Sequence, residues 1–167
     1  MNVSIPPECL ICLRDNAEAA DRDPVWPAVS WQALDQAGVL RWEIDPALGG
    51  CAADALTILD GLEQIAAACL TTCFILSQRQ AAVRRIADMA TDPLRSELLP
   101  SLASGRSFAT VGLSQLTTSR QHGQTSLLAR AVGEGFVLDG VIPWVTGAAA
   151  CDTIVTGAPT AAGEQVF

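Results

Sequence analysis

The sequence predicts an α+β protein in which an N-terminal all-α helical bundle is followed by an incomplete antiparallel β-barrel or sandwich. The longer, N-terminal part carries apolar side chains at helical spacing. After Gly105 the pattern changes to the alternation typical of strands. Half of the 167 residues are hydrophobic, which is enough for a sizeable core. We therefore expect a helical domain over 1–106 and a β domain over 107–167.

Helix start and stop residues mark the N-terminal part. Pro7 favours a helix start, Ser30 is a suitable N-cap, and Gly38 is a suitable terminating residue. The segment 54–78 is the longest helical pattern, and we place it centrally because its second half is apolar nearly all round. Helices are expected at 8–20, 31–37, 54–78, 80–89 and 94–103, with an extended segment at 39–44.

Turn signals separate short strands in the C-terminal part. The residues 133–135 predict a turn, and Asp139 followed by Gly140 is a strong hairpin signal. Because side chains alternate along a strand, Trp144 and Thr146 are expected on one face. A flat aromatic ring beside a hydroxyl donor is a suitable wall for a planar heteroaromatic ligand. Strands are expected at 108–113, 125–132, 136–138, 141–145 and 153–156.

The last residues resemble the start of another strand, which would leave an open apolar sheet edge at Phe167. Natural proteins cover such edges. We therefore expect the chain to be a fragment or a truncated gene product.

Composition excludes several functions. A net charge of −8 argues against a nucleic-acid partner, which requires a basic surface. The longest apolar run, 65–76, is too short for a membrane span, which needs about 20 apolar residues. The six cysteines lack nearby histidine, since His122 is the only one, so we expect no metal site and assign the thiols to a reducing cytoplasm.

Several motifs occur in an order that resembles the acyl-CoA dehydrogenase family. The chain from about Trp31 onward is similar to the family's N-terminal helical domain and the start of its middle β domain. A Trp-Val-Thr sequence at 144–146 stands where relatives have Trp-Ile-Thr. The other similar segments are 34–40, 46–50, 99–105 and 149–155.

This resemblance implies an FAD cofactor and assigns two groups of residues. The implied FAD-contacting residues are Val111, Leu113, Ser114, Trp144, Val145 and Thr146. Ser119 and Arg120 stand where acyl-CoA or another small-molecule substrate approaches in relatives. The family's catalytic carboxylate lies on a C-terminal helical domain, so no catalytic residue is expected in this chain. The resemblance also implies a homo-oligomer when the protein is full length.

The chain departs from the family in one loop. Where relatives have Leu-Thr-Glu-Pro-x-Ala-Gly-Ser-Asp, the residues 113–121 keep a hydroxyl at Ser114 but have Gln115 for Glu and Arg120 for a small residue. Three hypotheses follow. The first is part of an FAD-dependent oxidoreductase of fatty acid metabolism that acts on CH–CH groups of acyl-CoA thioesters. The second is a flavin-dependent monooxygenase of the same fold, and the third is a non-catalytic remnant or partner-binding module.

Overall fold

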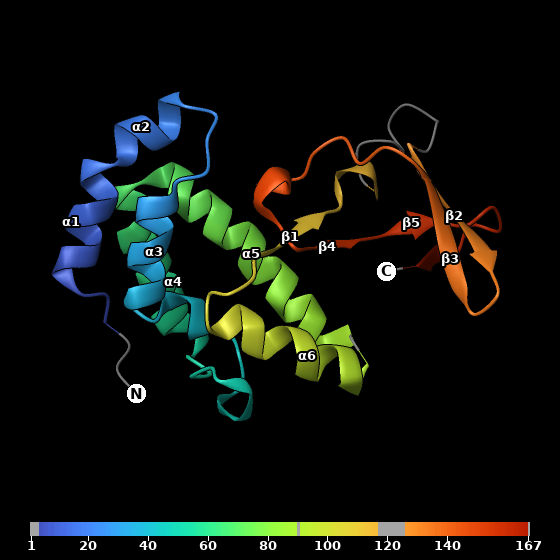
Figure 1. The fold of residues 1–167 in the computed structure, drawn as a ribbon, viewed down its shortest axis with the longest axis horizontal. Coiled ribbons are helices and arrows are strands. Elements are labelled where there is room, and N and C mark those ends of the chain that lie inside the picture. The colour runs from blue at the N-terminus through green and yellow to red at the C-terminus, as the bar shows by residue number, and fades with distance from the viewer. Residues whose placement is uncertain (1–3, 90, 117–125, 167) are drawn as a thin grey trace.

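A computed structural model of the protein describes residues 4–89, 91–116 and 126–166. It confirms the predicted α+β class, with helices preceding strands. The helices are α1 (Pro7–Asp15), α2 (Ala17–Arg22), α3 (Ala28–Gln36), α4 (Ala55–Ala68), α5 (Leu70–Met89) and α6 (Asp92–Ala103). Short 3-10 turns are η1 (Val39–Arg41), η2 (Pro46–Leu48) and η3 (Ala148–Ala150). Figure 1 shows α1 to α4 grouped at one end, with α5 running from that group toward the strands.

Several helical details differ from the prediction: the expected helix 8–20 is divided into α1 and α2, and α5 continues through residue 79 into the expected helix 80–89. The expected 54–78 helix is broken at Cys69, whose backbone is extended, and the Thr72 N–H donates to the Cys69 thiol as α5 begins. Ser30 is buried inside α3 rather than capping it, because the helix begins after Pro27. The expected extended segment at 39–44 begins with η1. Gly38 does end α3 in the left-handed conformation at φ 75°, as predicted.

Two apolar clusters form the core of the helical part. The first joins α1, α3, α4 and the start of α5 around Leu13, Leu34 and Ile65. The second joins α5 and α6 to the first strand, where Ala109 packs among Val83 and Leu102. That strand is therefore anchored on the helices. The predicted domain boundary between residues 106 and 107 stays a prediction.

A buried arginine ties these elements together. Arg79 on α5 is 2% exposed, and its Nη2 donates to the carbonyl oxygens of Leu40 at 2.9 Å and Leu102 at 2.7 Å. Burial lowers the pKa of Arg79 to about 10, so the side chain stays charged at neutral pH. The Leu102 carbonyl also accepts from the Gly105 N–H at 3.2 Å, so the guanidinium joins the end of α6 to η1 through buried carbonyl oxygens.

Among the described residues the strands form three two-stranded sheets and no closed barrel. They are β1 (Ala109–Gly112), β2 (Leu127–Val132), β3 (Gly135–Gly140), β4 (Thr153–Thr156), β5 (Ala158–Pro159) and β6 (Gln165–Val166). The pairs β2–β3 and β5–β6 are antiparallel, as expected. The pair β1–β4 is parallel, which the sequence did not predict. Figure 1 shows β1 and β4 lying between the helices and the β2–β3 hairpin.

The predicted hairpin at Asp139–Gly140 is wrong. The turn of the hairpin lies at 133–134, and Gly140 is the end of β3, paired with Leu127. The expected strand over 141–145 does not form. Pro143 has no N–H to donate to a neighbouring strand, so the ladder cannot continue through it. The chain instead crosses back toward β1.

Candidate functional site

The residue that ends β1 lies against the segment that follows the hairpin. A Cβ on Gly112 would be 2.9 Å from Val145 Cγ2 and 3.0 Å from Ile142 Cγ2. No larger side chain fits there, so the backbone of β1 comes close to the segment 142–146. This contact brings together the two halves of the site that the sequence predicted, although they are some thirty residues apart.

An exposed indole and two hydroxyl groups lie at this junction. Trp144 is 64% exposed, and its Nε1 donates to Thr146 Oγ1 at 3.0 Å. The Ser114 hydroxyl lies 3.5 Å from the Trp144 carbonyl oxygen. Trp144 and Thr146 therefore act on the same side, as predicted, but through a side-chain hydrogen bond in an irregular segment rather than through strand alternation.

The other predicted contact residues lie in different environments. Leu113 and Val145 are half-buried at the same junction. Val111 is half-buried and packs against the core cluster of α5 and α6, and its assignment to the cofactor stays a prediction. Ser119 and Arg120 lie outside the described residues, and their assignment to a substrate stays a prediction.

The turn after Thr146 is supported by an aromatic cluster that the sequence did not reveal. Gly147 has a φ of 71°, and a Cβ there would be 2.9 Å from Phe108 Cε1 and 3.3 Å from Trp26 Cζ3. The ring centroids of Trp26 and Phe108 are 4.8 Å apart, and Trp31 lies 5.2 Å from Phe108. The cluster fixes the position of Gly147 and with it the orientation of Thr146.

A cavity of about 430 Å³ opens beside Thr146. Its apolar wall includes Trp26, Phe74 and Ile75, and Thr71 and Asp23 contribute polar atoms. The volume lies in the range of small-molecule sites, roughly 300 to 1,000 Å³. Of the predicted site residues, Thr146 contributes to the wall of this cavity.

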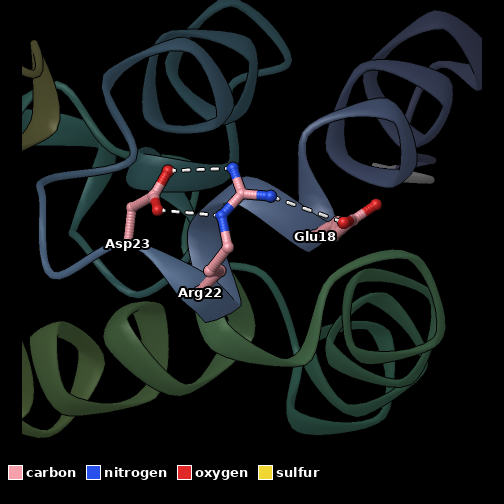
Figure 2. Close-up of polar contacts among 3 residues, drawn as sticks. All are labelled: Glu18, Arg22 and Asp23. Carbon is pink, nitrogen blue, oxygen red and sulfur yellow. Dashed lines mark hydrogen bonds and ion pairs between the residues drawn. The ribbon is translucent and has the colours of Figure 1, made fainter.

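The Asp23 carboxylate at this cavity is held by an ion pair. Figure 2 shows Arg22 between Asp23, which it contacts at 3.0 and 3.2 Å, and Glu18 at 3.4 Å. All three side chains are largely exposed, so the cluster adds little to stability. Of the three, only Asp23 lines the cavity, and one guanidinium against two carboxylates leaves the cluster with a net negative charge.

Gln115 is a buried residue of the site that the sequence did not single out as a contact. Its side chain is 1% exposed and its Nε2 donates to Gly112 O at 3.0 Å, to Thr156 Oγ1 at 3.0 Å and to Gly157 O at 2.6 Å. Its partners Thr156 and Gly157 come after the β2–β3 hairpin in the sequence, about 40 residues away. No local pattern could have predicted this network.

Thiol and metal chemistry find little support in the described part of the chain. Burial raises the pKa of Cys9 to about 11 and also raises the pKa of Cys73 and Cys151, so these thiols stay protonated at neutral pH. Within residues 4–89, 91–116 and 126–166, no three metal-ligating side chains cluster. Across those same ranges, no helix combines the length and apolarity needed to span a bilayer.

In this fold a helical domain supports an aromatic and hydroxyl surface formed after β1 and in the irregular segment 142–146. Residues 12–106, more than half of the chain, match the model of the acyl-CoA dehydrogenase N-terminal domain. The chain therefore belongs to the acyl-CoA dehydrogenase family.

Relatives show how much of a family member the chain represents. It is 26% identical over 145 residues to the human mitochondrial short-chain specific acyl-CoA dehydrogenase, covering 86% of this chain and 35% of that protein. The chain thus spans about a third of the length of the curated relatives it matches.

Solved structures share the fold. FMN-bound TdsC from Paenibacillus sp. A11-2, a dibenzothiophene monooxygenase, is 17% identical, with a TM-score of 0.80 over 99% of this chain and 42% of that one. The FAD complex of an acyl-CoA dehydrogenase from Bacillus anthracis is 20% identical, with a TM-score of 0.72 over 94% and 29%.

Proposed function

We propose that the protein is part of an FAD-dependent oxidoreductase that acts on CH–CH groups of acyl-CoA thioesters in fatty acid metabolism. The observation that carries this proposal is the exposed indole of Trp144, hydrogen-bonded to Thr146 and next to the Ser114 hydroxyl. Family membership and the acyl-CoA dehydrogenases among the relatives support it. A bound flavin would accept the hydride from the substrate.

The residues of the site fit a flat ring with polar edges. Trp144 offers an exposed aromatic surface for one edge of the ring system. Because Thr146 Oγ1 already accepts the indole N–H, its own hydroxyl hydrogen is free to donate outward. Ser114 offers a second hydroxyl at the end of β1. These groups would bind and orient the ring, while the 430 Å³ cavity would take the apolar part of the substrate.

Flavin titration tests the proposal directly. Quenching of flavin fluorescence by the purified protein should give a tighter dissociation constant for FAD than for FMN. The substitution Trp144→Ala should weaken binding, and Trp144→Phe should restore part of it, because the ring surface returns without the N–H donor. Anaerobic addition of a short acyl-CoA should then bleach the bound flavin.

A flavin-dependent monooxygenase of the same fold is the second candidate. It is favoured by Gln115, which stands in the loop where this chain departs from the family's acyl-CoA motif and which binds carbonyl oxygens that an ionised Glu could not bind. The fold shared with TdsC is compatible with it. Oxygen consumption with reduced flavin and an aromatic heterocycle, without bleaching by acyl-CoA, would support this candidate.

The remaining parts of the proposal concern assembly and location. We propose a homo-oligomer in the cytoplasm, which light scattering and cell fractionation can test. A folded protein that binds neither FAD nor FMN would leave the partner-binding module as the surviving hypothesis, and affinity purification would then look for a stable second subunit.

A further inference from the structure

The side chain of Gln115 cross-links the ends of two parallel strands. It lies just after β1, and its Nε2 reaches Gly112 O on β1, Thr156 Oγ1 at the end of β4, and Gly157 O beyond it. Thr156 Oγ1 in turn donates to Gly112 O at 2.7 Å. The side chain is 1% exposed, so water does not compete for these bonds.

The chemistry of the partners requires a donor at this position. Both carbonyl oxygens are acceptors, and the Thr156 hydroxyl has already given its hydrogen to Gly112 O. A carboxylate at position 115 would face oxygen lone pairs in a buried environment, which raises the pKa of a carboxyl group. An uncharged amide brings two N–H hydrogens to three acceptors, so one hydrogen is shared, while its own Oε1 is buried without a hydrogen-bond partner in the described part of the chain.

The cross-link acts on both halves of the proposed cofactor surface. Gln115 directly follows Ser114, and Gly112 packs against Val145, next to Trp144. We infer that Gln115 is a positioning residue for the flavin, holding the Ser114 hydroxyl and the Trp144 segment in register through β4. This inference rests on the proposed flavin-binding function. Because Gln115 is 1% exposed, it would act on the cofactor through Ser114 and the Trp144 segment rather than by contact.

Methionine and glutamate substitutions test the donor requirement. Gln115→Met keeps most of the volume but removes both donors, and should weaken flavin binding about tenfold or more. Gln115→Glu should bind well only at low pH, where its protonated carboxyl can still donate, and its affinity should fall as pH rises. The wild-type protein should show no such dependence over the same range.

Two substitutions of Thr156 test the hydroxyl that Gln115 contacts. Thr156→Ser keeps the hydroxyl that bridges Gln115 to Gly112 and should leave flavin affinity within about twofold of wild type. Thr156→Val removes the hydroxyl and should weaken binding in the same direction as Gln115→Met. A role limited to packing would not distinguish serine from valine in this way.

A stability-matched control separates positioning from global unfolding. Leu13→Ala opens a cavity in α1, in a core cluster that includes no residue of β1 or β4 and reaches the β part at Phe108 and Cys151. It should lower the free energy of unfolding without changing the flavin dissociation constant of the folded protein. Hydrogen exchange of peptides covering 112–116 and 156–158 should increase in Gln115→Met and stay unchanged in Leu13→Ala.

The outcomes distinguish failure of the positioning role from failure of the proposed function. Unchanged flavin affinity in Gln115→Met, equal weakening in Leu13→Ala, or a flat pH profile in Gln115→Glu overturns the positioning role. Failure of the wild-type protein to bind any flavin refutes the proposed function and the role toward the cofactor. In that event the exchange of 112–116 still decides separately whether Gln115 cross-links the strands.

Discussion

Replacing Gly147 by alanine perturbs the turn that orients Thr146. The glycine has a φ of 71°, which is the left-handed region, and a Cβ added to it would lie within 3.3 Å of ring atoms of Phe108 and Trp26. The added methyl group would therefore meet two separate penalties. One is local to the backbone, and the other comes from the aromatic cluster.

The two penalties have different sizes. Holding an L-residue in the left-handed conformation costs about 1 kcal/mol. The methyl carbon would be 2.9 Å from Phe108 Cε1 and 3.3 Å from Trp26 Cζ3, closer than carbon atoms pack, and overpacking costs about 1 to 3 kcal/mol. We expect Gly147→Ala to lower the free energy of unfolding by about 2 to 4 kcal/mol.

Gly133 supplies a matched control. It also has a positive φ, 59°, but a Cβ there would meet no atom within 4 Å. Gly133→Ala should therefore lose only the backbone part, about 1 kcal/mol. Urea denaturation of both variants measures the difference, and flavin titration of the folded variants shows whether the displaced turn also weakens binding.

The comparison has a clear failing outcome. Equal losses of unfolding free energy in the two variants would mean that the aromatic cluster yields to the methyl group at no cost. The cluster would then not hold Thr146 in place. A larger loss in Gly147→Ala with unchanged flavin affinity would keep the packing argument and remove the link from packing to the cofactor.

Three further predictions concern single side chains. Because Trp144 is 64% exposed, Trp144→Ala should change the free energy of unfolding by less than about 0.5 kcal/mol while weakening flavin binding, and a large stability loss in denaturation would contradict this. Arg79→Met should lower the free energy of unfolding in urea by about 3 kcal/mol, because it removes charged hydrogen bonds to two buried carbonyls. A loss below about 1 kcal/mol would refute the idea that Arg79 ties these elements together. Burial raises the pKa of Glu43 above its usual value despite its ion pair with Arg84, so the folded state holds that proton more tightly than the unfolded chain does. The unfolding free energy should therefore fall as pH rises from the ordinary carboxyl pKa through the raised one. Glu43→Gln should remove that dependence, and identical pH profiles would show that the ion pair offsets the burial.

Helix ends could be predicted from the sequence where a single residue type determines them. Gly38 ends α3 because only a residue tolerant of positive φ fits there, and that preference is visible in the sequence. The break at Cys69 was not predictable from spacing, since apolar residues continue at helical intervals through it. At the break, the Cys69 thiol contacts the hydroxyl and the N–H of Thr72 in the buried core, and apolar spacing does not reveal such a polar contact.

The site was predicted in its residues more than in its geometry. The pairing of Trp144 with Thr146 emerged from strand periodicity, yet the structure achieves it with a side-chain hydrogen bond in an irregular segment. Gln115 and Gly147 act through partners about 40 residues away in sequence, Thr156 and Phe108. Such long-range contacts leave no local pattern, so only the folded chain reveals them.

Strand β1, which leads into one half of the candidate site, packs on the helices. Phe108 lies in the first core cluster and Ala109, its neighbour, lies in the second, so the start of β1 is fixed on both. Since Ala82 and Ala109 are both fully buried in the second cluster, a larger side chain at either position would have to displace β1 or α5. Any shift of β1 moves Gly112 and Ser114 relative to Trp144. The helices therefore determine the geometry of the proposed cofactor surface, although that surface is formed by residues that follow them.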